Sequence, residues 1–570
     1  MDKLIIIGFI VGALILALII NFVGEKKKVK NFEKKLKANF GKLARKEYDP
    51  EKKNSYRAYY KKHQNDNSFS LDDITWNDAE GETLFTSINN CYSSCGEEYL
   101  YYRLRNVDLN ASKEDIDEYV SQTDKLIEDE ETRIKLQLAF AMLGKTGRHS
   151  VFDYISLLGN VKRIPLFVFF IIWIGYIAGI ASIFVIGPTA GICFLVTWMI
   201  VCLILSIYNK KTIEAYMTSF EYIVRSLKTT EKIVGMKIPM YEKESKRLAE
   251  LRKELNGIRT SFLSFIQTSN RIGIADLASG MVSLFNSFVM IDLFLFNLML
   301  KFVIDKEDTY DEIFSILGKM ESQIAIANLK ASFEDTCVPE FVDERHIKAE
   351  DMIHPLVENC VANSYDAKRG MLITGSNASG KSTFLRCVLV NTILAETVYV
   401  ACAKNFSLKK SYIYSSMSLK DSLGGGESYY MAEINSIKRI IDSLEAGDNI
   451  ICFLDEVLRG TNTVERVAAA TEILRVLDNP NAMSFAATHD IELTYLLEEN
   501  YDNYFFREEF RKEEGSESED ICFTYKINEG RSDTRNALKL LEIKGYPTDM
   551  CEKAKRLSQN FISTGEWKSE

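Results

Sequence analysis

One glycine-rich segment constrains the fold of this chain more than any other feature. Residues 371–383 read MLITGSNASGKST and satisfy the phosphate-loop pattern G-x-x-x-x-G-K-[ST] through Gly375, Gly380, Lys381 and Ser382. The apolar start of this segment predicts a strand, and a helix is expected to begin near Lys381. In such a loop, backbone N–H groups close around phosphate oxygens and the helix N-terminus adds positive potential. The segment therefore predicts an α/β domain that holds a nucleotide, with Lys381 on the β- and γ-phosphates and Ser382 on Mg²⁺.

Two further apolar runs end in residues that suit phosphate chemistry. Residues 450–454 (IICFL) predict a buried strand that ends at Asp455 and Glu456. Since α/β sheets place functional groups at the carboxyl ends of their strands, we expect Asp455 to hold the Mg²⁺ shell and Glu456 to polarise the attacking water. A structural strand followed by a helix-capping acidic pair is the alternative, and the upstream loop disfavours it. A third strand over 483–487 leads to His489, which is expected to contact the γ-phosphate or the attacking water.

Several segments of this region resemble the MutS mismatch-repair family. Residues 374–386 are similar to the phosphate loop of that family, and residues 454–463 to its acidic strand end and the loop that follows. Residues 487–494 look like its histidine-containing strand end. Residues 426–434 resemble the start of its signature helix, and residues 532–557 its C-terminal helix-turn-helix.

The resemblance implies a fold, cofactors and a partner. The implied fold is an α/β P-loop NTPase domain of the ABC-type, MutS-like class, preceded by an all-α core and lever domain that is matched weakly over 70–330. ATP and Mg²⁺ are the implied cofactors, and Asn377 and Thr383 join the loop residues that bind the nucleotide. The family also implies a homodimer through the ATPase domain, in which Ser428 reaches the γ-phosphate held by the other subunit.

The chain departs from the family pattern in the phosphate loop, in the loop after Glu456 and in its N-terminal part. Ser376, Ala378 and Ser379 replace the usual Pro, Met and Gly with the loop spacing kept, and Leu458 stands where Gly is usual. A mismatch-reading N-terminal domain is not expected, because an apolar segment and a linker occupy that part of the chain. The resemblance therefore leaves open the rate of hydrolysis and the binding of mismatched double-stranded DNA.

Apolar runs predict three transmembrane helices. Residues 4–23 are long enough to cross a bilayer, and the lysine-rich flank after them places the N-terminus outside and the following chain in the cytoplasm. A cleaved signal peptide is the alternative, which the weakly charged start and the lysine block disfavour. A second apolar block, 165–208, is broken at 187–189 and has lysine or arginine on both flanks. We expect a helical hairpin with both ends in the cytoplasm, and hence a multi-pass protein of the plasma membrane with a cytoplasmic ATPase domain.

A fourth apolar stretch, residues 281–300, contains Asn286, Asp292 and Asn297. An ionisable group in the middle of a span is costly in lipid. A further crossing would also carry the nucleotide site out of the cytoplasm. We therefore predict that this stretch is a buried core helix.

Length and composition bound the organisation of the chain. A chain of 570 residues predicts several units, which we expect to be a transmembrane helix (1–24), a basic juxtamembrane linker (25–68), a first helical core or lever segment (69–163), the hairpin (164–208), a second helical segment (209–335) and the ATPase domain with its helix-turn-helix (336–570). The lysines of the linker suit anionic lipid head groups. A net charge of −10 argues against indiscriminate nucleic-acid binding, although a local basic face stays open. The cysteines lack metal-ligand spacing and fit a reducing compartment.

Three functions fit these observations. The first is a membrane-anchored, MutS-like ATPase dimer that binds DNA, including mismatched DNA, in a repair-like role. The second is a mechanochemical or scaffolding ATPase that acts on a protein or membrane partner without DNA, because the hairpin interrupts the lever region. The third is a half-transporter of the ABC type. The short stretch between Lys381 and Asp455 disfavours it, because little room remains for the helical subdomain of that class.

Overall fold

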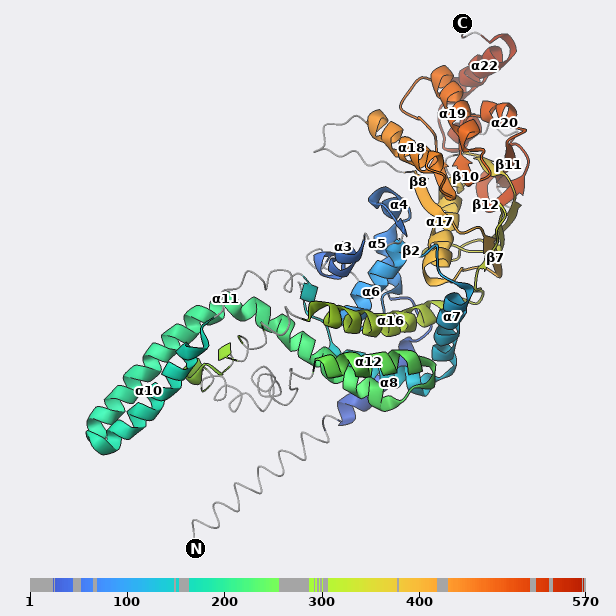
Figure 1. Cartoon of the computed structure of the whole chain (residues 1–570). Helices are drawn as coiled ribbons and strands as arrows, with labels where there is room; N and C mark the ends of the chain where they lie inside the picture. Colours follow the sequence, from blue (N-terminus) through green and yellow to red (C-terminus); the bar gives the residue numbers. More distant parts are fainter. Residues whose placement is uncertain are drawn as a thin grey trace. The chain divides into compact units, whose positions relative to one another are not determined.

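The computed structural model describes residues 24, 26–44, 53–64, 69–147, 150–152, 164–255, 285, 287–291, 293–294, 297, 300, 306–376, 379–417, 429–512, 519–532, 537–565 and 567. The chain divides into two compact units (Figure 1), of which the first consists of Met1–Gln64, Ile88–Tyr102 and Asp117–Ser332 and the second of Asn65–Ser87, Arg103–Ile116 and Phe333–Glu570. Residues 65–87 and 103–116 thus group with the C-terminal unit and not with the helical segment expected over 69–163. The apolar run 4–23 lies outside the described residues.

The first unit is helical, and the helix Glu307–Ala331 lies in its core. Its helices, in whole or in part, are α2 (Lys53–Tyr56), α3 (Ala58–His63), α6 (Ser94–Arg105), α7 (Lys113–Glu128), α8 (Glu130–Leu143), α10 (Leu166–Val185), α11 (Pro188–Met236), η2 (Pro239–Tyr241), α12 (Glu242–Glu254) and α16 (Glu307–Ala331). On α16, Ile313, Phe314 and Leu317 recur at the three- and four-residue spacing of a helix face and are fully buried. They share one core cluster with Leu136 of α8 and Leu251 of α12.

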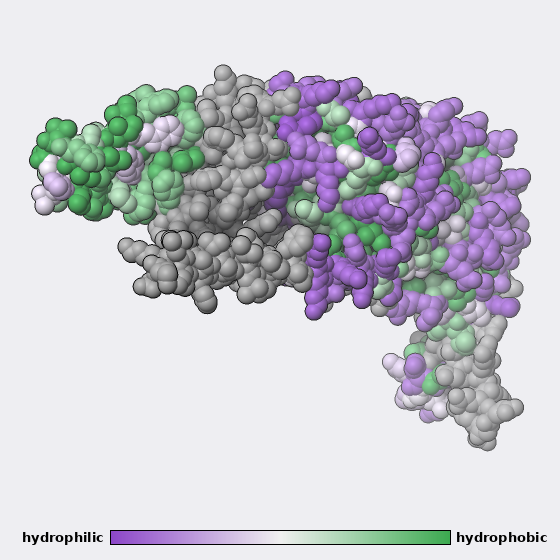
Figure 2. Space-filling model, turned by 90° about the horizontal axis from the view of Figure 1, so that it is seen from below, coloured by the Kyte–Doolittle hydropathy of each residue, from purple (hydrophilic) through white to green (hydrophobic). Residues whose placement is uncertain are grey.

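Helices α10 and α11 form a hairpin, seen at the left of Figure 1, and Figure 2 shows an apolar surface at the left of its view. The break expected at 187–189 is where α10 ends and α11 begins, with Gly187 at φ +129° and Pro188 as the first helical residue. Two stretches, Leu166–Val185 and Pro188–Asn209, are each long and apolar enough to cross a membrane by length and composition. Two of the three spans predicted from the sequence therefore fall within the described residues.

The two hairpin helices approach each other closely, and the second continues far beyond the hairpin. A methyl group at Gly175 would overlap the Trp198 ring, and one at Gly179 would overlap Leu195. Small residues that permit such approach are typical of helix pairs in membranes. Helix α11 then continues without interruption for 49 residues and ends in the core of the first unit, where Leu227 is fully buried.

The apolar stretch 281–300, predicted to be a buried core helix, is described only in part. Of its described residues, Met290, Leu293 and Leu300 are buried, whereas Phe285 is 57% exposed. Burial is therefore confirmed at the first three positions and wrong at Phe285.

Two aromatic side chains of α10 bind the backbone of this stretch. The Tyr176 hydroxyl donates to the Phe288 carbonyl oxygen, and Trp173 Nε1 donates to the Val289 carbonyl oxygen, both at 3.0 Å. Met290 follows with φ +56°. A left-handed residue breaks the regular series of helical hydrogen bonds, so the carbonyl groups just before it need donors from elsewhere.

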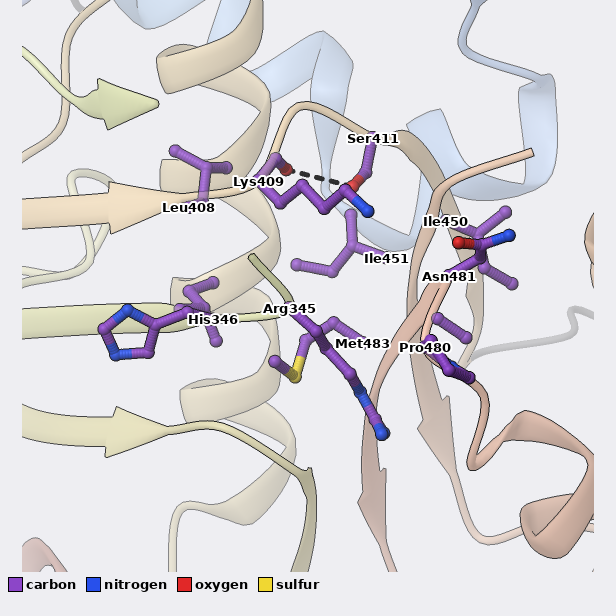
Figure 3. Close-up of a pocket in the computed structure, with 12 residues that line it drawn as sticks. Arg345, His346, Leu408, Lys409, Ser411, Ile450, Ile451, Pro480, Asn481 and Met483 are labelled. Carbon is purple, nitrogen blue, oxygen red and sulfur yellow. Dashed lines mark hydrogen bonds between the residues drawn. The ribbon is translucent and has the colours of Figure 1, made fainter. Parts of the chain in front are cut away.

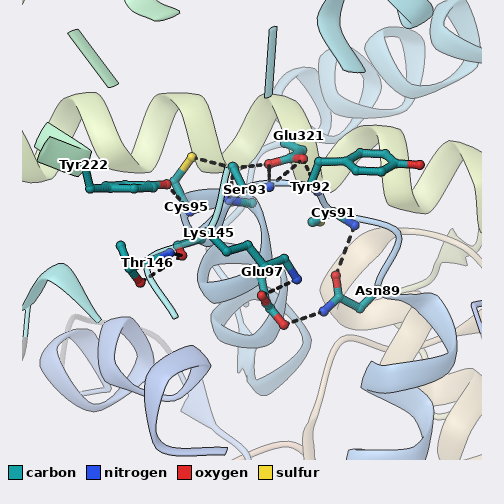
Figure 4. A network of polar contacts seen from close by, with 12 residues as sticks. Asn89, Cys91, Tyr92, Ser93, Cys95, Glu97, Lys145, Thr146, Tyr222 and Glu321 are labelled. Carbon is teal, nitrogen blue, oxygen red and sulfur yellow. Dashed lines mark hydrogen bonds and ion pairs between the residues drawn. The ribbon is translucent and has the colours of Figure 1, made fainter. Parts of the chain in front are cut away.

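A buried carboxylate holds the start of α6 against α16 (Figure 4). Glu321 of α16 accepts hydrogen bonds from the backbone N–H groups of Tyr92, at 2.6 Å, and Ser93, at 3.2 Å, and from the Ser93 hydroxyl. These donors precede a helix N-terminus, which favours a negative partner. Burial nevertheless raises the pKa of Glu321 to about 7. Gly96, in the first turn of α6, faces the same carboxylate and leaves no room for a side chain.

The second unit contains a six-stranded sheet in the order β12-β11-β6-β10-β9-β8. Its strands are β6 (Gly370–Thr374), β8 (Tyr412–Ser416), β9 (Ile450–Asp455), β10 (Ala482–Ala487), β11 (Tyr501–Lys512) and β12 (Glu519–Glu529). Neighbouring strands are parallel except β12, which is antiparallel to β11. The strands expected at 371–373, 450–454 and 483–487 are confirmed, and they lie side by side as β6, β9 and β10. Residues of β6 and β10 are buried throughout, as expected for a sheet covered on both faces.

Helices cover both faces of this sheet. The helices of the second unit are α4 (Asp73–Asp78), α5 (Gly81–Ile88), α17 (Lys381–Val398), α18 (Tyr429–Glu445), α19 (Thr463–Leu477), α20 (Glu492–Leu496), α21 (Ala537–Ile543) and α22 (Thr548–Thr564). Ile440 of α18 and Leu474 of α19 share a cluster with Cys452 of β9. On the other face, the ring of Phe506 of β11 lies 5.6 Å from that of Phe384 of α17. The helix predicted to start near Lys381 is therefore confirmed as α17.

Smaller elements complete the second unit. A four-stranded sheet has the order β3-β7-β4-β5, and a two-stranded sheet pairs β1 with β2. These strands are β1 (Phe69–Ser70), β2 (Asn106–Val107), β3 (Glu340–Phe341), β4 (Ile347–Met352), β5 (Asn363–Ala367) and β7 (Asn405–Leu408).

Helix α4 covers the edge strand β8. Ser415 donates from its backbone N–H to Thr75 Oγ1, at 3.1 Å, and from its hydroxyl to Asp78 Oδ2, at 2.6 Å. The N–H of Met417, just past the strand, donates to the same Asp78 oxygen at 2.9 Å. The side chains of α4 thus accept hydrogen bonds from backbone N–H groups at the edge of the sheet. Without α4, another strand could pair with these groups. These bonds explain why residues 65–87 group with the second unit.

Substitutions of two glycines are expected to change stability in opposite directions, because an added methyl group meets Glu321 at Gly96 and open space at Gly235. Gly96→Ala should destabilise the first unit by about 1–3 kcal/mol, because the methyl group displaces the carboxylate that binds the start of α6. Gly235→Ala, in the last turn of α11 with nothing near the added methyl, should be neutral or stabilising by up to about 1 kcal/mol. Thermal unfolding of the purified full chain measures both. Equal midpoints for the two variants would contradict the structure.

Candidate functional site

The phosphate-loop segment forms a tight turn between β6 and α17. Gly375 has φ +144°, and a Cβ there would come within 2.8 Å of the Phe506 carbonyl oxygen. Gly380, at the start of the helix, has φ +104°. Only glycine adopts such angles without strain and permits so close an approach of neighbouring backbone. The two glycines of the motif are therefore required by the geometry of the turn. Asn377 and Ala378, at the tip, lie outside the described residues.

Lys381 is buried at the mouth of this turn. Only 4% of the residue is exposed, and its Nζ donates to the carbonyl oxygens of Gly375, at 2.7 Å, and Ser376, at 2.9 Å. Burial lowers the pKa of Lys381 to about 8, although Asp455 and Glu456 oppose the shift. A cation held in a poorly hydrated position has much to gain from an anionic ligand.

Ser382 and Asp455 meet at the carboxyl ends of β6 and β9. The Ser382 hydroxyl donates to Asp455 Oδ2 at 2.6 Å. Burial raises the pKa of Asp455, and the bond from Ser382 and the charge of Lys381 oppose that rise. A hydroxyl and a carboxylate are oxygen donors of the kind that Mg²⁺ takes from proteins, in small number, alongside phosphate oxygens. The residues present therefore fit the expected magnesium ion.

Glu456 and His489 face each other across the ends of β9 and β10. Glu456 Oε1 lies 3.1 Å from His489 Nε2, and Glu456 Oε2 lies 3.0 Å from Arg459 Nε. His489 Nε2 is also 3.3 Å from Lys381 Nζ. Burial and the charge of Lys381 lower the pKa of His489, which favours the neutral ring. The structure therefore brings Lys381, Ser382, Asp455, Glu456 and His489 into one cluster.

Sequence reasoning missed the ion pair that fixes the His489 loop. Arg466 of α19 binds Asp490 through two bonds, 2.7 and 2.8 Å long. The Asp490 N–H also donates to Thr488 Oγ1 at 3.0 Å. A bidentate pair of this type fixes orientation as well as distance. No local pattern connects Arg466 with Asp490, because the two residues are adjacent only after the sheet forms.

A second missed residue is Glu433 of α18, which binds the loop that follows Glu456. Its Oε1 accepts from the N–H of Leu458, at 2.6 Å, and of Arg459, at 3.3 Å. The residue is 5% exposed, and burial raises its pKa. Leu458, at the position where glycine is usual, has φ +58°. That backbone costs a non-glycine residue roughly 1–2 kcal/mol, which burial of the Leu458 side chain and the bond to Glu433 help to offset.

A cavity of about 400 Å³ adjoins the start of α17. Its lining includes Gly380 and Thr383 from the loop and helix, so it borders the candidate phosphate site. The other lining residues are His354, Val357, Glu358, Asn359, Cys360, Val361, Asn363, Phe384, Cys387, Phe506 and Tyr525. Burial, with the charge of Arg386, lowers the pKa of His354 to about 4, so the ring is neutral at physiological pH. The cavity has the volume and the aromatic lining of a small-molecule site.

A second hollow in this unit is too small for a nucleotide (Figure 3). It lies at the opposite edge of the sheet, where β9 begins at Ile450 and β10 at Ala482, and Arg345 and Asn481 help to line it. Its volume of about 10 Å³ is that of a single water molecule. The functional groups of the candidate site are thus confined to the carboxyl edge of the sheet. Ser428, expected to act across a dimer, lies outside the described residues.

The candidate site lies within the part of the chain that is similar to known proteins. Residues 371–562 match the family model described as MutS domain V. The chain is 30% identical over 259 residues to the DNA mismatch repair protein MutS of Thermotoga maritima, which is 44% of this chain and 32% of that protein. It is 30% identical over 256 residues to the DNA mismatch repair protein MutS of Thermus aquaticus, covering 44% and 30%. It is 28% identical over 260 residues to MutS protein homolog 4 of Homo sapiens, covering 42% and 27%. Each match spans less than a third of the relative.

The position of Glu433 predicts a separation of nucleotide binding from turnover. Glu433→Ala removes the acceptor of the Leu458 and Arg459 N–H groups, so the loop that carries Glu456 loses its anchor while Lys381 and Ser382 stay in place. ATP turnover should fall by about tenfold or more, the effect of misplacing a catalytic group, with nucleotide affinity nearly unchanged. Glu433→Gln, which keeps an oxygen acceptor, should recover part of the rate.

Glu445→Ala is the matched control, because this glutamate is exposed on the same helix. It should leave both quantities unchanged. Equal loss of affinity and turnover in Glu433→Ala would show that Glu433 only supports the fold.

Proposed function

We propose, because this chain belongs to the MutS family through its domain V, that it binds and hydrolyses ATP with Mg²⁺. The carrying observation is the convergence of Lys381, Asp455 and Glu456 at the carboxyl edge of the sheet. A buried ammonium with a lowered pKa suits phosphate, and an aspartate paired with a serine hydroxyl suits a divalent cation. The carboxyl edge of the sheet thus offers a positive partner for the phosphates and oxygen ligands for the magnesium ion.

Each residue of the cluster has a distinct role in this proposal. Lys381 exchanges its bonds to loop carbonyls for bonds to the β- and γ-phosphates. Ser382 and Asp455 would hold Mg²⁺, which when bound would supply positive charge against the phosphate oxygens. Glu456 accepts a hydrogen bond from the attacking water and orients it, and neutral His489 contacts Glu456 or the γ-phosphate.

The cavity beside the loop supplies a place for the base and sugar. Because Gly380 and Thr383 help to line the cavity, a base bound there would lie next to the phosphates. Aromatic rings of Phe506 and Tyr525 and the neutral ring of His354 offer faces on which a purine can stack. We assign Asn377, Thr383 and the backbone of the turn to the phosphates, as the family pattern implies.

A homodimer is part of the proposal. Met550, Leu557 and Phe561 recur on α22 at spacings of seven and four residues and are each more than a third exposed. Such a stripe on one helix face suits another apolar surface. The second copy would complete each nucleotide site with its Ser428.

Anchoring to a bilayer is supported by the hairpin. Many apolar side chains of α10 and α11 are exposed, among them Phe184 at 84% and Ile177 at 67%. So extended an apolar surface is unfavourable in water and favourable in hydrocarbon. The site then lies on the cytoplasmic side of the plasma membrane, in the multi-pass arrangement that the flanking charges predict.

A second candidate function rests on the length of α11. One uninterrupted helix joins the hairpin to the buried core of the first unit. At 1.5 Å per residue it is about 74 Å long. A continuous helix transmits displacement between the membrane and the core, which suits a mechanochemical or scaffolding ATPase without DNA. The repair-like role on double-stranded or mismatched DNA rests on the names of the relatives.

Two substitutions test the ATPase directly. Lys381→Ala should weaken nucleotide binding by about a hundredfold, because charge-assisted hydrogen bonds contribute roughly 1.5–3 kcal/mol each. Glu456→Gln should bind Mg-ATP normally, lose about 10²–10⁴-fold in turnover and accumulate as a closed dimer. Calorimetry, phosphate release and light scattering measure these quantities. Lys404→Ala, an exposed lysine in the same unit, is the control. Wild-type turnover in Glu456→Gln would refute the assigned role.

The two candidate functions differ in their response to DNA. The full chain in lipid nanodiscs should retard matched and mismatched duplexes at low salt if the repair-like role holds, with binding that weakens steeply as salt rises. A preference for the mismatch would support repair. Absence of retardation with ATP, with ADP and without nucleotide would leave the mechanochemical function.

A further inference from the structure

Seven lysines lie on one helix of the first unit. Residues 26–39 are helical and contain these lysines together with a single acidic residue, Glu33. Lysines three or four positions apart on a helix repel one another. This helix, here called the basic helix, therefore gains stability from packing on one side and from negative charge on the other. The seven are Lys26, Lys27, Lys28, Lys30, Lys34, Lys35 and Lys37.

One side of the basic helix packs against the rest of the first unit. Leu36 is 2% exposed, with Phe32 four positions before it and Phe40 four positions after it, in line with the same face. The Phe32 ring meets the Tyr92 ring edge to face, with centroids 5.4 Å apart. The Arg133 guanidinium lies 3.6 Å from the centre of the Phe40 ring. These contacts fix which side of the helix faces away from the unit.

The chain just after the basic helix is bound to the core helix α16. The Gly41 N–H donates to Asn328 Oδ1, and Asn328 Nδ2 donates to the Lys42 carbonyl oxygen, both at 2.8 Å. Asn328 is 4% exposed. Phe40 packs against the core cluster to which Phe169 of α10 also belongs. The basic helix and the hairpin are therefore attached to the same core.

The opposite side of the basic helix carries a row of three lysines. Lys27, Lys30 and Lys34 recur at three- and four-residue spacing, and Lys27 and Lys34 lie roughly 180° and 160° around the helix from Leu36. All three are exposed, and none has an ion pair or hydrogen bond with any described residue. Lys37, by contrast, is paired with a glutamate of α8. The charges of the lysine row are thus left for a partner outside the chain.

The place of the basic helix in the sequence indicates that partner. The apolar run 4–23 ends just before it, and Lys27 is four residues past Val23, so the two Cα atoms are at most about 14 Å apart. If this run crosses a bilayer, the lysine row begins at the membrane surface, where anionic head groups create a negative potential. A DNA duplex near that surface would be repelled by the same potential. Lipid is therefore the favoured partner.

We propose that Lys27, Lys30 and Lys34 bind the head groups of anionic phospholipids in the cytoplasmic leaflet. Lysine suits this role, because its apolar stem can lie along a surface while the ammonium group reaches a phosphate. The proposal rests on the bilayer anchoring proposed above. It adds an orientation, because Leu36 and the chain after the helix fix the lysine row to the core of the first unit. Head groups bound to the row then determine which side of that unit faces the membrane.

Amine labelling of the full chain in nanodiscs tests this surface. One preparation contains phosphatidylcholine alone, and the other contains phosphatidylcholine with a minor fraction of phosphatidylglycerol. After a pulse of an acetylating reagent, mass spectrometry measures the rate at each lysine, with exposed Lys253 of α12 as the reference. The lysine row should react about fivefold or more slowly with phosphatidylglycerol, the effect of one lysine at an anionic surface. Salt at about 1 M should abolish the difference, because it shortens the Debye length to about 3 Å.

The outcomes separate the lysine row from the anchoring. Equal rates in the two kinds of nanodisc would overturn head-group binding and leave the anchoring intact. A chain that does not elute with the nanodiscs would overturn the anchoring and, with it, this inference. Slower labelling only after addition of duplex DNA would assign the row to nucleic acid and overturn the lipid partner. ATP turnover in the same samples reports on the candidate nucleotide site independently of these lysines.

A double substitution tests the row itself. Lys27→Gln with Lys34→Gln removes two charges and keeps good helix formers. Labelling of Lys30 in the phosphatidylglycerol nanodiscs should then approach its rate in phosphatidylcholine alone. Lys246→Gln with Lys253→Gln is the matched control, because these exposed lysines are also seven residues apart on one helix of the same unit. In the control, labelling of Lys30 should stay slow. Equal rates at Lys30 in the two double variants would overturn the role of the row.

Discussion

Two backbone hydrogen bonds hold together the strand ends on which the candidate site depends. The Thr488 N–H donates to the Ile373 carbonyl oxygen at 3.0 Å, and the Glu456 N–H donates to the Ala487 carbonyl oxygen at 2.9 Å. They join β6, β10 and β9 at their carboxyl ends. Since a shift of one residue would turn every side chain of a strand to the opposite face, the register of these strands fixes where each loop begins. The positions of the charged groups of the site therefore depend on that register.

The site so formed is electrostatically incomplete in a way that indicates its ligand. Burial lowers the pKa of Lys381 and raises that of Asp455, so both charged forms are poorly solvated by their surroundings. An anion beside the lysine and a cation beside the aspartate would relieve both penalties together. A magnesium nucleotide carries both kinds of charge, which is why it is the ligand proposed above. The adjoining cavity, lined in part by Thr383, then has room for the rest of the molecule.

The helical unit follows the same physical rule with different groups. Backbone groups left open by an irregularity receive a side-chain partner from another helix. Glu321 of α16 accepts from the N–H groups before α6, and Trp173 and Tyr176 of α10 donate to the carbonyl groups before Met290. In each case the backbone group is removed from water, where an unmade hydrogen bond would be costly. The backbone groups that they bind thus explain the positions of Glu321, Trp173 and Tyr176.

The sequence by itself determined the three parallel strands, the phosphate turn, the start of α17 and the hairpin, because glycine spacing, apolar runs and strand-end acids are local signals. It also named the five clustered residues from Lys381 to His489. Only the tertiary structure decided the roles of Glu433 and Arg466 and the contacts of Val289 and Phe294 with α10. These depend on which distant segments become neighbours, and a charged or polar residue looks the same in a sequence whether it faces water or binds a buried loop.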